Sequence, residues 1–171
     1  AMSFTSRDVQ LITADLTGVS PVSVTGSISY QDVDTTVLLF IGCNARRQPL
    51  DDPALRRALG MAVNRSRIVS AFLSGHGSAA QFPVSPVSPL YPTALERTYS
   101  KDELTATLAQ SGYTPGRTLT LLVNSENSFK TSIAAYLADS FTDAGIPVSV
   151  KALPWEEFTA ALAAGNFDLY Y

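Results

Sequence analysis

Cysteine and histidine are almost absent from the sequence, and this limits the chemistry that the chain can perform. The 171 residues include one cysteine, Cys43, and one histidine, His76. A single cysteine excludes an internal disulfide bond and a zinc site built from several cysteines. We expect no dedicated metal site, because no cluster of histidines or cysteines stands at ligand spacing. Cys43 is expected to be a small buried side chain, and His76, between two glycines, a solvated loop residue.

Charged residues are also scarce, and they form no long runs of one sign. They make up 16% of the chain, whereas average domains contain roughly 25%. Basic residues occur in runs of two at most, as at Arg46-Arg47 and Arg56-Arg57, so we expect no nucleic-acid partner, which would require a basic stripe. No apolar run reaches the roughly 20 residues of a membrane helix. A surface so poor in charge indicates that another surface covers part of it.

The second half of the chain alternates between strand patterns and helix patterns. Strand patterns occupy 117–123, 146–153 and 167–171, and helix patterns occupy 100–113, 128–145 and 154–165. Strands that alternate with helices of this length imply a parallel sheet with right-handed crossovers. We therefore predict an α/β fold, a mostly parallel open sheet with helices on both faces, in which 167–171 lies inside the sheet.

The first half begins with strand patterns and continues with two helices. The strand patterns lie at 8–14, 21–30 and 35–42, and the last is a continuous apolar run, as in a strand covered on both faces. In the helical region 49–75, Asp51 or Asp52 can cap the first helix and Asn64 the second. Arg56 lies opposite the apolar stripe of the first helix, where a structural role is expected.

A long stretch at 74–98 contains repeated prolines and serines. Loops of this length inside a compact domain tend to be functional. The prolines restrict the chain, and Phe82, Leu90 and Tyr91 can attach it to the core. We therefore predict a long ordered surface loop and not a linker between two domains.

The stretch LLFIGCNARRQPLDDPALRRALGMAVNRSRIVSAFLSG (38–75) resembles a family signature. The family is that of the extracytoplasmic solute-binding proteins of oligopeptide, dipeptide and nickel ABC importers. Its pattern is a strand ending in Asn, followed by Pro-Phe-x-Asp-x-x-Val-Arg-x-Ala-Leu-x-x-Ala-Ile-Asp-Arg. The matching positions are Asn44, Pro49, Asp52, Leu55, Arg56, Ala58, Leu59, Ala62, Val63, Asn64 and Arg65. The stretches YSKDELTATLAQSGY, RTLTLLVNSEN and SIAAYLADSFTDAGIPVSVKALPWEEFTAALAAGNFDLYY follow in the family's order.

This resemblance implies a fold, a function and a set of partners. Members are two-lobed clamps of the type II periplasmic-binding-protein kind, and 1–171 is similar to the C-terminal lobe. We expect one domain, an excised ligand-binding lobe, with residues 1–2 a cloning remnant. The implied function is the solute-binding component of an ABC importer for peptides or related small solutes, with no cofactor and no enzymatic activity. The implied partners are the solute, the other lobe of the same protein and the membrane permease, in an extracytoplasmic location, either periplasmic or anchored as a lipoprotein.

Two departures from the family pattern limit what the resemblance implies. Asn64 stands where the family usually has Asp, so a helix cap is retained but a carboxylate is lost. Peptide-binding members also carry an Asp shortly after the last strand, beyond the end of this sequence. The ligand class therefore does not carry over.

Two other functions are compatible with the same α/β pattern. The chain can be the ligand-sensing domain of a transcriptional regulator, which an upstream helix-turn-helix would indicate. It can also be a small flavodoxin-like enzyme domain, although no nucleophile–base pair or metal cluster stands out. The full-length reading frame separates these alternatives.

The ligand site is expected where the strands of the sheet end. Open α/β sheets bind ligands outside the carboxyl ends of their strands, and these ends lie near Asn44, Asn124, Leu153 and Tyr171. In peptide-binding relatives a Trp matching Trp155 helps to line the cleft, and the alternative is a core Trp packed on Phe158. The predicted ligand-binding residues are Phe40, Gly42, Asn44, Trp155, Tyr170 and Tyr171.

Overall fold

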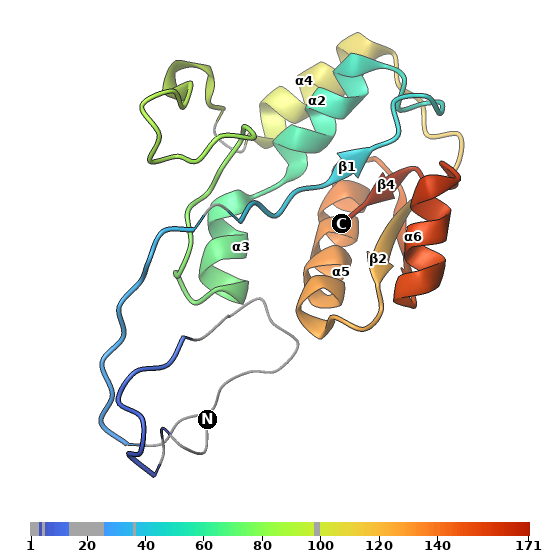
Figure 1. The fold of residues 1–171 in the computed structure, drawn as a ribbon. Coiled ribbons are helices and arrows are strands. Elements are labelled where there is room, and N and C mark those ends of the chain that lie inside the picture. Colours follow the sequence, from blue (N-terminus) through green and yellow to red (C-terminus); the bar gives the residue numbers. More distant parts are fainter. Residues whose placement is uncertain (1–3, 5, 14–25, 36, 98–99) are drawn as a thin grey trace.

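A computed structural model describes residues 4, 6–13, 26–35, 37–97 and 100–171 (Figure 1). The strands are β1 (Gly42–Cys43), β2 (Leu119–Asn124), β3 (Val148–Leu153) and β4 (Leu169–Tyr170). The helices are α2 (Pro53–Ala62), α3 (Arg65–Phe72), the short 3-10 helix η1 (Thr93–Leu95), α4 (Lys101–Ser111), α5 (Ser128–Asp143) and α6 (Trp155–Ala163). None of the helices in these ranges is long and apolar enough to cross a membrane.

The four strands form one open sheet in the order β1-β4-β2-β3. β2 is parallel to β3 and to β4, whereas β1 is antiparallel to β4. α5 and α6 cover opposite sides of β2 (Figure 1). The alternation of side chains along β2 supports this, because Leu119, Leu121 and Val123 join the main core while Leu122 does not. The predicted α/β fold, with a mostly parallel sheet and helices on both faces, is confirmed.

α2, α3 and α4 each begin after a polar residue that caps the helix. Asp52 accepts a hydrogen bond from the N–H of Ala54 and caps α2, and Asn64 caps α3 through the N–H of Arg67. Ser100 caps α4 by accepting from the N–H of Glu103. Each cap satisfies an N–H that has no partner within its own helix, which is why short polar residues occur at these points.

The sequence-based prediction of strands near the N-terminus is wrong. Residues 8–13, 26–30 and 37–41 form no strand, and of the predicted run at 35–42 only Gly42 is part of one, in β1. Residues 14, 21–25 and 36 lie outside the described residues. An alternating or apolar pattern becomes a strand only when another strand supplies hydrogen-bond partners. Only at Gly42 and Cys43 does β4 run alongside, and Val37 and Phe40 remain exposed.

The proline-rich loop is ordered over 74–97 and is attached to the helices at its base. The guanidinium of Arg65 donates to the carbonyls of Ala80, Gly60 and Val63. Tyr91 is buried and its ring contacts that of Phe82, with the centroids 5.6 Å apart. Leu90, in contrast, is 82% exposed, so its predicted role in attaching the loop is wrong.

We predict that Tyr91→Phe destabilises this loop. The Tyr91 hydroxyl accepts from the N–H of Gln81 and donates to Glu96 Oε1 at 2.7 Å. Its removal leaves the Gln81 N–H without a partner, at a cost of about 1–2 kcal/mol in the free energy of unfolding. Urea unfolding followed by circular dichroism measures this loss. The control is Tyr30→Phe, which alters an exposed ring; equal midpoints for the two variants would contradict the prediction.

Candidate functional site

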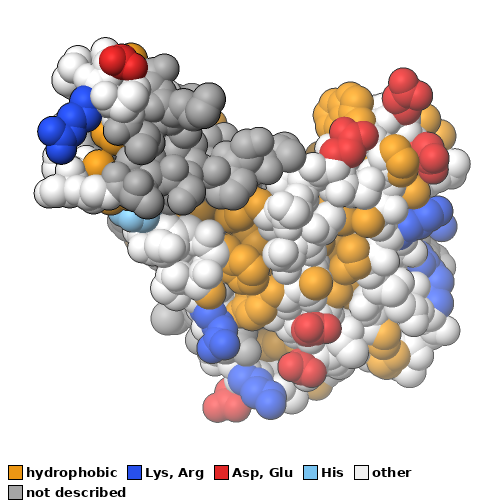
Figure 2. All heavy atoms as spheres, turned by 90° about the horizontal axis from the view of Figure 1, so that it is seen from below, with side chains coloured by type: hydrophobic (Ala, Val, Ile, Leu, Met, Phe, Trp, Pro, Cys, Tyr) orange, Lys and Arg blue, Asp and Glu red, His pale blue; other side chains and the backbone are white. Residues whose placement is uncertain are grey.

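The carboxyl ends of β2, β3 and β4 meet at one edge of the sheet. These strands end at Asn124, Leu153 and Tyr170, and α5 and α6 begin at the same edge, on the lower side of the sheet in Figure 1. Figure 2 views the molecule from this side and shows hydrophobic side chains gathered there, some of them next to acidic ones. This is the edge at which open α/β sheets bind ligands.

Three aromatic rings cluster on the face of the sheet that α6 covers. The Tyr170 ring meets Phe40 edge-on at 6.0 Å and Phe167 edge-on at 5.4 Å between centroids. Gly42 pairs with Tyr170 across β1 and β4, and a Cβ at Gly42 would overlap the Tyr170 ring. The absence of a side chain at Gly42 therefore allows the ring to lie flat over β1. Phe40 remains 55% exposed.

Trp155 is exposed at the same edge of the sheet. It is the first residue of α6, and 54% of it is accessible to solvent. Its indole stacks on Phe158 with centroids 6.0 Å apart, while the backbone N–H of Trp155 donates to Glu126 Oε1. The stacking on Phe158 matches the core alternative, but the exposure does not. A large, half-exposed aromatic ring fixed on a helix suits contact with a ligand or another surface.

Tyr171 points to the opposite face of the sheet from Tyr170. It is 9% exposed and belongs to the main core beside α5, with the Lys130 ammonium 5.9 Å from its ring centroid. Burial raises the pKa of the Tyr171 hydroxyl to about 12. The two neighbouring tyrosines thus occupy different environments, one in the core and one on the surface.

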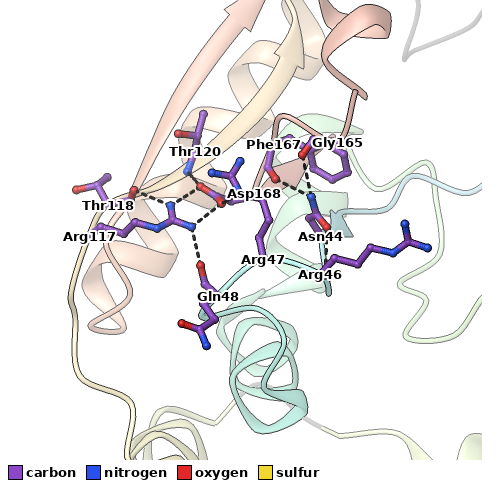
Figure 3. Close-up of polar contacts among 10 residues, drawn as sticks. All are labelled: Asn44, Arg46, Arg47, Gln48, Arg117, Thr118, Thr120, Gly165, Phe167 and Asp168. Atoms are coloured by element: carbon purple, nitrogen blue, oxygen red, sulfur yellow. Dashed lines mark hydrogen bonds and ion pairs between the residues drawn. The ribbon is translucent and has the colours of Figure 1, made fainter. Parts of the chain in front are cut away.

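Asn44 lies at the other end of β1 from Phe40, so the predicted alignment of strand ends is wrong for β1. Because β1 runs antiparallel to β4, its carboxyl end lies at the amino end of β4. There the Asn44 amide donates to the carbonyls of Gly165 and Phe167, both at 3.1 Å. Its Oδ1 accepts from the N–H of Arg46 (Figure 3). The structure thus brings Phe40, Gly42 and Tyr170 together and places Asn44 at the far edge.

The sequence analysis does not predict the ion pair beside Asn44, in which a buried Asp168 meets a half-exposed Arg117. Asp168 is 2% exposed and forms two 2.7 Å hydrogen bonds with the guanidinium of Arg117 (Figure 3). Burial alone would raise the pKa of this carboxyl, but the bonds from Arg117 and the Thr120 N–H, with the nearby charge of Arg47, lower it. The signal in the sequence was an acid inside the apolar segment FDLYY, since a buried Asp is rare unless it is paired.

The remaining polar residues singled out in the sequence have structural contacts. Arg56 donates to the carbonyls of Leu50 and Asp51 ahead of α2, as a structural residue would. His76 lies on the surface with Nδ1 2.8 Å from Asp32. Within the described ranges, no group of three or more His, Cys, Asp and Glu residues is placed to hold a metal ion. Cys43 is partly buried, and burial raises the pKa of its thiol despite the charge of Arg56.

Comparison with known proteins assigns the chain to a family. The family described as "Bacterial extracellular solute-binding proteins, family 5 Middle" matches residues 1–171. The chain belongs to this family. It is 28% identical over 145 residues to the oligopeptide-binding protein AppA of Bacillus subtilis, and 25% identical over 130 residues to a di/tripeptide-binding protein of Pseudomonas aeruginosa.

The relationship to these family 5 proteins covers a part of each of them. The matches include 76% and 74% of this chain but 27% and 24% of the two relatives, so the chain spans about a quarter of their length. The solved structure of AppA with a nonapeptide superimposes with a TM-score of 0.66 at 26% identity, covering 76% of this chain and 29% of AppA. The fold is therefore that of a segment of a family 5 binding protein.

We predict that a neutral quencher reaches Trp155 in this chain. The sequence has a single tryptophan, so all indole emission reports on the half-exposed side chain at the start of α6. Acrylamide should quench this emission nearly as well as that of free tryptophan, and the emission maximum should be red-shifted. A blue-shifted emission resistant to quenching would show that Trp155 is a core residue.

We also predict that Gly42→Ala moves the Tyr170 ring. The new methyl group would overlap this ring, and overpacking of this kind typically costs about 1–3 kcal/mol. The matched control is Gly60→Ala in α2, where nothing lies within 4 Å of the added Cβ and where alanine favours the helix by roughly 0.5–1 kcal/mol. Urea unfolding should lower the midpoint for the first variant and raise it for the second. Equal shifts in the same direction would contradict the packing described here.

Proposed function

We propose that the chain is one ligand-binding lobe of the solute-binding component of an ABC importer that takes peptides or related small solutes. The observation that carries this proposal is the aromatic surface at the carboxyl edge of the sheet, formed by Phe40 and Tyr170 with Trp155 along the same edge. The family supports the proposal, because its members are extracellular solute-binding proteins. The two relatives named above are called peptide-binding proteins.

The chemistry of this surface suits an uncharged or peptide-like ligand. Ligand pockets are typically lined by apolar and aromatic side chains, with a few polar groups that fix orientation. Phe40 and Trp155 supply the apolar contact, and Asn124 at the end of β2 supplies an amide. In this proposal a second lobe closes over the edge and buries the ligand between the two lobes. Phe40, Gly42, Trp155 and Tyr170 are the proposed contact residues; Asn44 and Tyr171 act through the fold.

The partners and the location follow from the same proposal. The closed, ligand-bound receptor presents itself to a membrane permease, outside the cytoplasm. Within the lobe no residue is assigned a catalytic role, since binding and closure require none. The surface charge of this lobe is low, which suits a protein that buries part of its surface against a second lobe and a ligand.

Calorimetry tests this function. We expect a full-length protein containing this chain to bind a nonapeptide or shorter peptides, and the 171-residue chain alone to bind them weakly or not at all, because half of the cleft is missing. Micromolar affinity for the isolated chain would contradict the shared cleft. A full-length reading frame with a helix-turn-helix segment, and no peptide-dependent uptake in cells, would instead identify a sensor domain.

A further inference from the structure

We propose that Asp168 and Arg117 are positioning residues for the aromatic surface. They lie at the amino edge of β4, opposite that surface, and fix the register and direction of β1 and β4. In this way they hold the Phe40 and Tyr170 rings together at the other edge. The surface's role in ligand binding rests on the proposed function, whereas the effect of the ion pair on ring position does not.

The first argument is the length of the two strands that carry the rings. β1 and β4 are two residues long, and their mutual ladder consists of the pairs Gly42↔Tyr170 and Cys43↔Leu169. β4 also pairs with β2, through Leu121↔Leu169 and Leu122↔Tyr170. β2 and β3 pair over six residues each. The side-chain contacts around Asp168 add to the two residue pairs that join β1 to β4.

The Asp168 carboxylate attaches β4 to the start of β2. Asp168 immediately precedes β4, and Arg117 lies two residues before β2. Each carboxylate oxygen accepts a 2.7 Å hydrogen bond from Arg117, and Oδ2 also accepts from the Thr120 N–H at 2.9 Å. A bidentate pair fixes orientation as well as distance. The third hydrogen bond, from the backbone N–H of Thr120 in β2, fixes the position of Asp168 along that strand.

The same groups attach the segment that follows β1. Arg117 Nη2 donates to the Gln48 carbonyl at 2.7 Å, and Arg47 Nε lies 3.6 Å from Asp168 Oδ1. The backbone N–H of Asn44 donates to the Asp168 carbonyl at 2.8 Å. The ion pair thus joins the carboxyl end of β1, the amino end of β4 and the amino end of β2 at one point (Figure 3).

This point is close enough to the rings to set their position. Tyr170 is two residues beyond Asp168 along the same strand direction, and Gly42 is two residues before Asn44. Residues two apart in an extended chain lie on the same face and are roughly 7 Å apart. A change of tilt at Asp168 therefore displaces the Tyr170 ring relative to β1. Gly42 provides no side chain that could hold the ring in its place.

The ion pair is permanent at neutral pH. Because the pKa of Asp168 is lowered in the folded protein, the stabilisation it provides is present above the unfolded value of about 4 and is lost as the pH falls through the folded value. Asp168→Asn removes the charge at constant size, and leaves the Arg117 guanidinium without its carboxylate partner. Arg117→Lys is the milder variant, because it keeps the charge and loses the bidentate geometry.

The experiment compares these variants with one that is equally destabilised elsewhere. The control is Leu104→Ala in α4, a buried residue of the α2–α4 side, which destabilises the chain by leaving a cavity in the core. In this chain, nuclear Overhauser contacts between the Phe40 and Tyr170 rings are measured at temperatures where each variant is folded. We expect Arg117→Lys and Asp168→Asn to lose or weaken these contacts, and Leu104→Ala to keep them. Full ring contacts in folded Arg117→Lys would overturn the proposal.

Peptide binding by the full-length protein gives the second measurement. With the AppA-type nonapeptide as probe, we expect the dissociation constant to rise about tenfold or more for Arg117→Lys, about 1.4 kcal/mol, and to stay unchanged for Leu104→Ala. Equal affinities for the two variants would overturn a positioning role in binding. If the unmodified protein binds no peptide, the proposed function fails, while the ring contacts still decide whether Asp168 and Arg117 position the rings.

Discussion

A single buried carboxylate joins the parts of this chain that the backbone ladders join only weakly. Asp168 receives hydrogen bonds from Arg117 and Thr120, and lies beside Arg47 from the segment after β1. Burying a carboxylate away from water costs free energy unless its oxygens accept hydrogen bonds. Here the Asp168 oxygens accept them from Arg117 and from the Thr120 N–H. The cost of burial is thereby offset by contacts that exist only when β1, β2 and β4 are correctly arranged. The ion pair therefore contributes specificity of arrangement more than net stability.

The direction of β1 decides which residues meet at the two edges of the sheet. The antiparallel pairing of β1 with β4 places Phe40 next to Tyr170 and sends Asn44 to the opposite edge. A parallel β1 would have placed Asn44 with the aromatic rings, as the sequence-based prediction assumed. The direction of this strand thus separates the polar contacts of Asn44 from the exposed ring of Phe40.

The sequence predicts local features of this chain better than distant pairings. Caps such as Asn64 and Ser100 act on N–H groups within one turn, so a few letters are enough to find them. β2 and β3 are also predictable, because helices of regular length separate them. The strand predictions for the N-terminal segments are wrong for the opposite reason. The pattern around Val37 is typical of a strand, but within the described residues no other strand pairs with it. Asp168 was missed because its partner Arg117 is distant in the sequence and only the fold brings them together.

Tyr170 and Tyr171 carry the same side chain but lie in two different environments, because they occupy neighbouring positions at the end of one strand. Successive residues of a strand point to opposite faces. Tyr171 therefore enters the core beside α5, where burial raises its pKa to about 12. Tyr170 instead lies over Gly42 between Phe40 and Phe167. A shift of β4 by one residue would exchange the two rings, so the aromatic surface depends on register, and the register depends on Asp168 immediately before the strand.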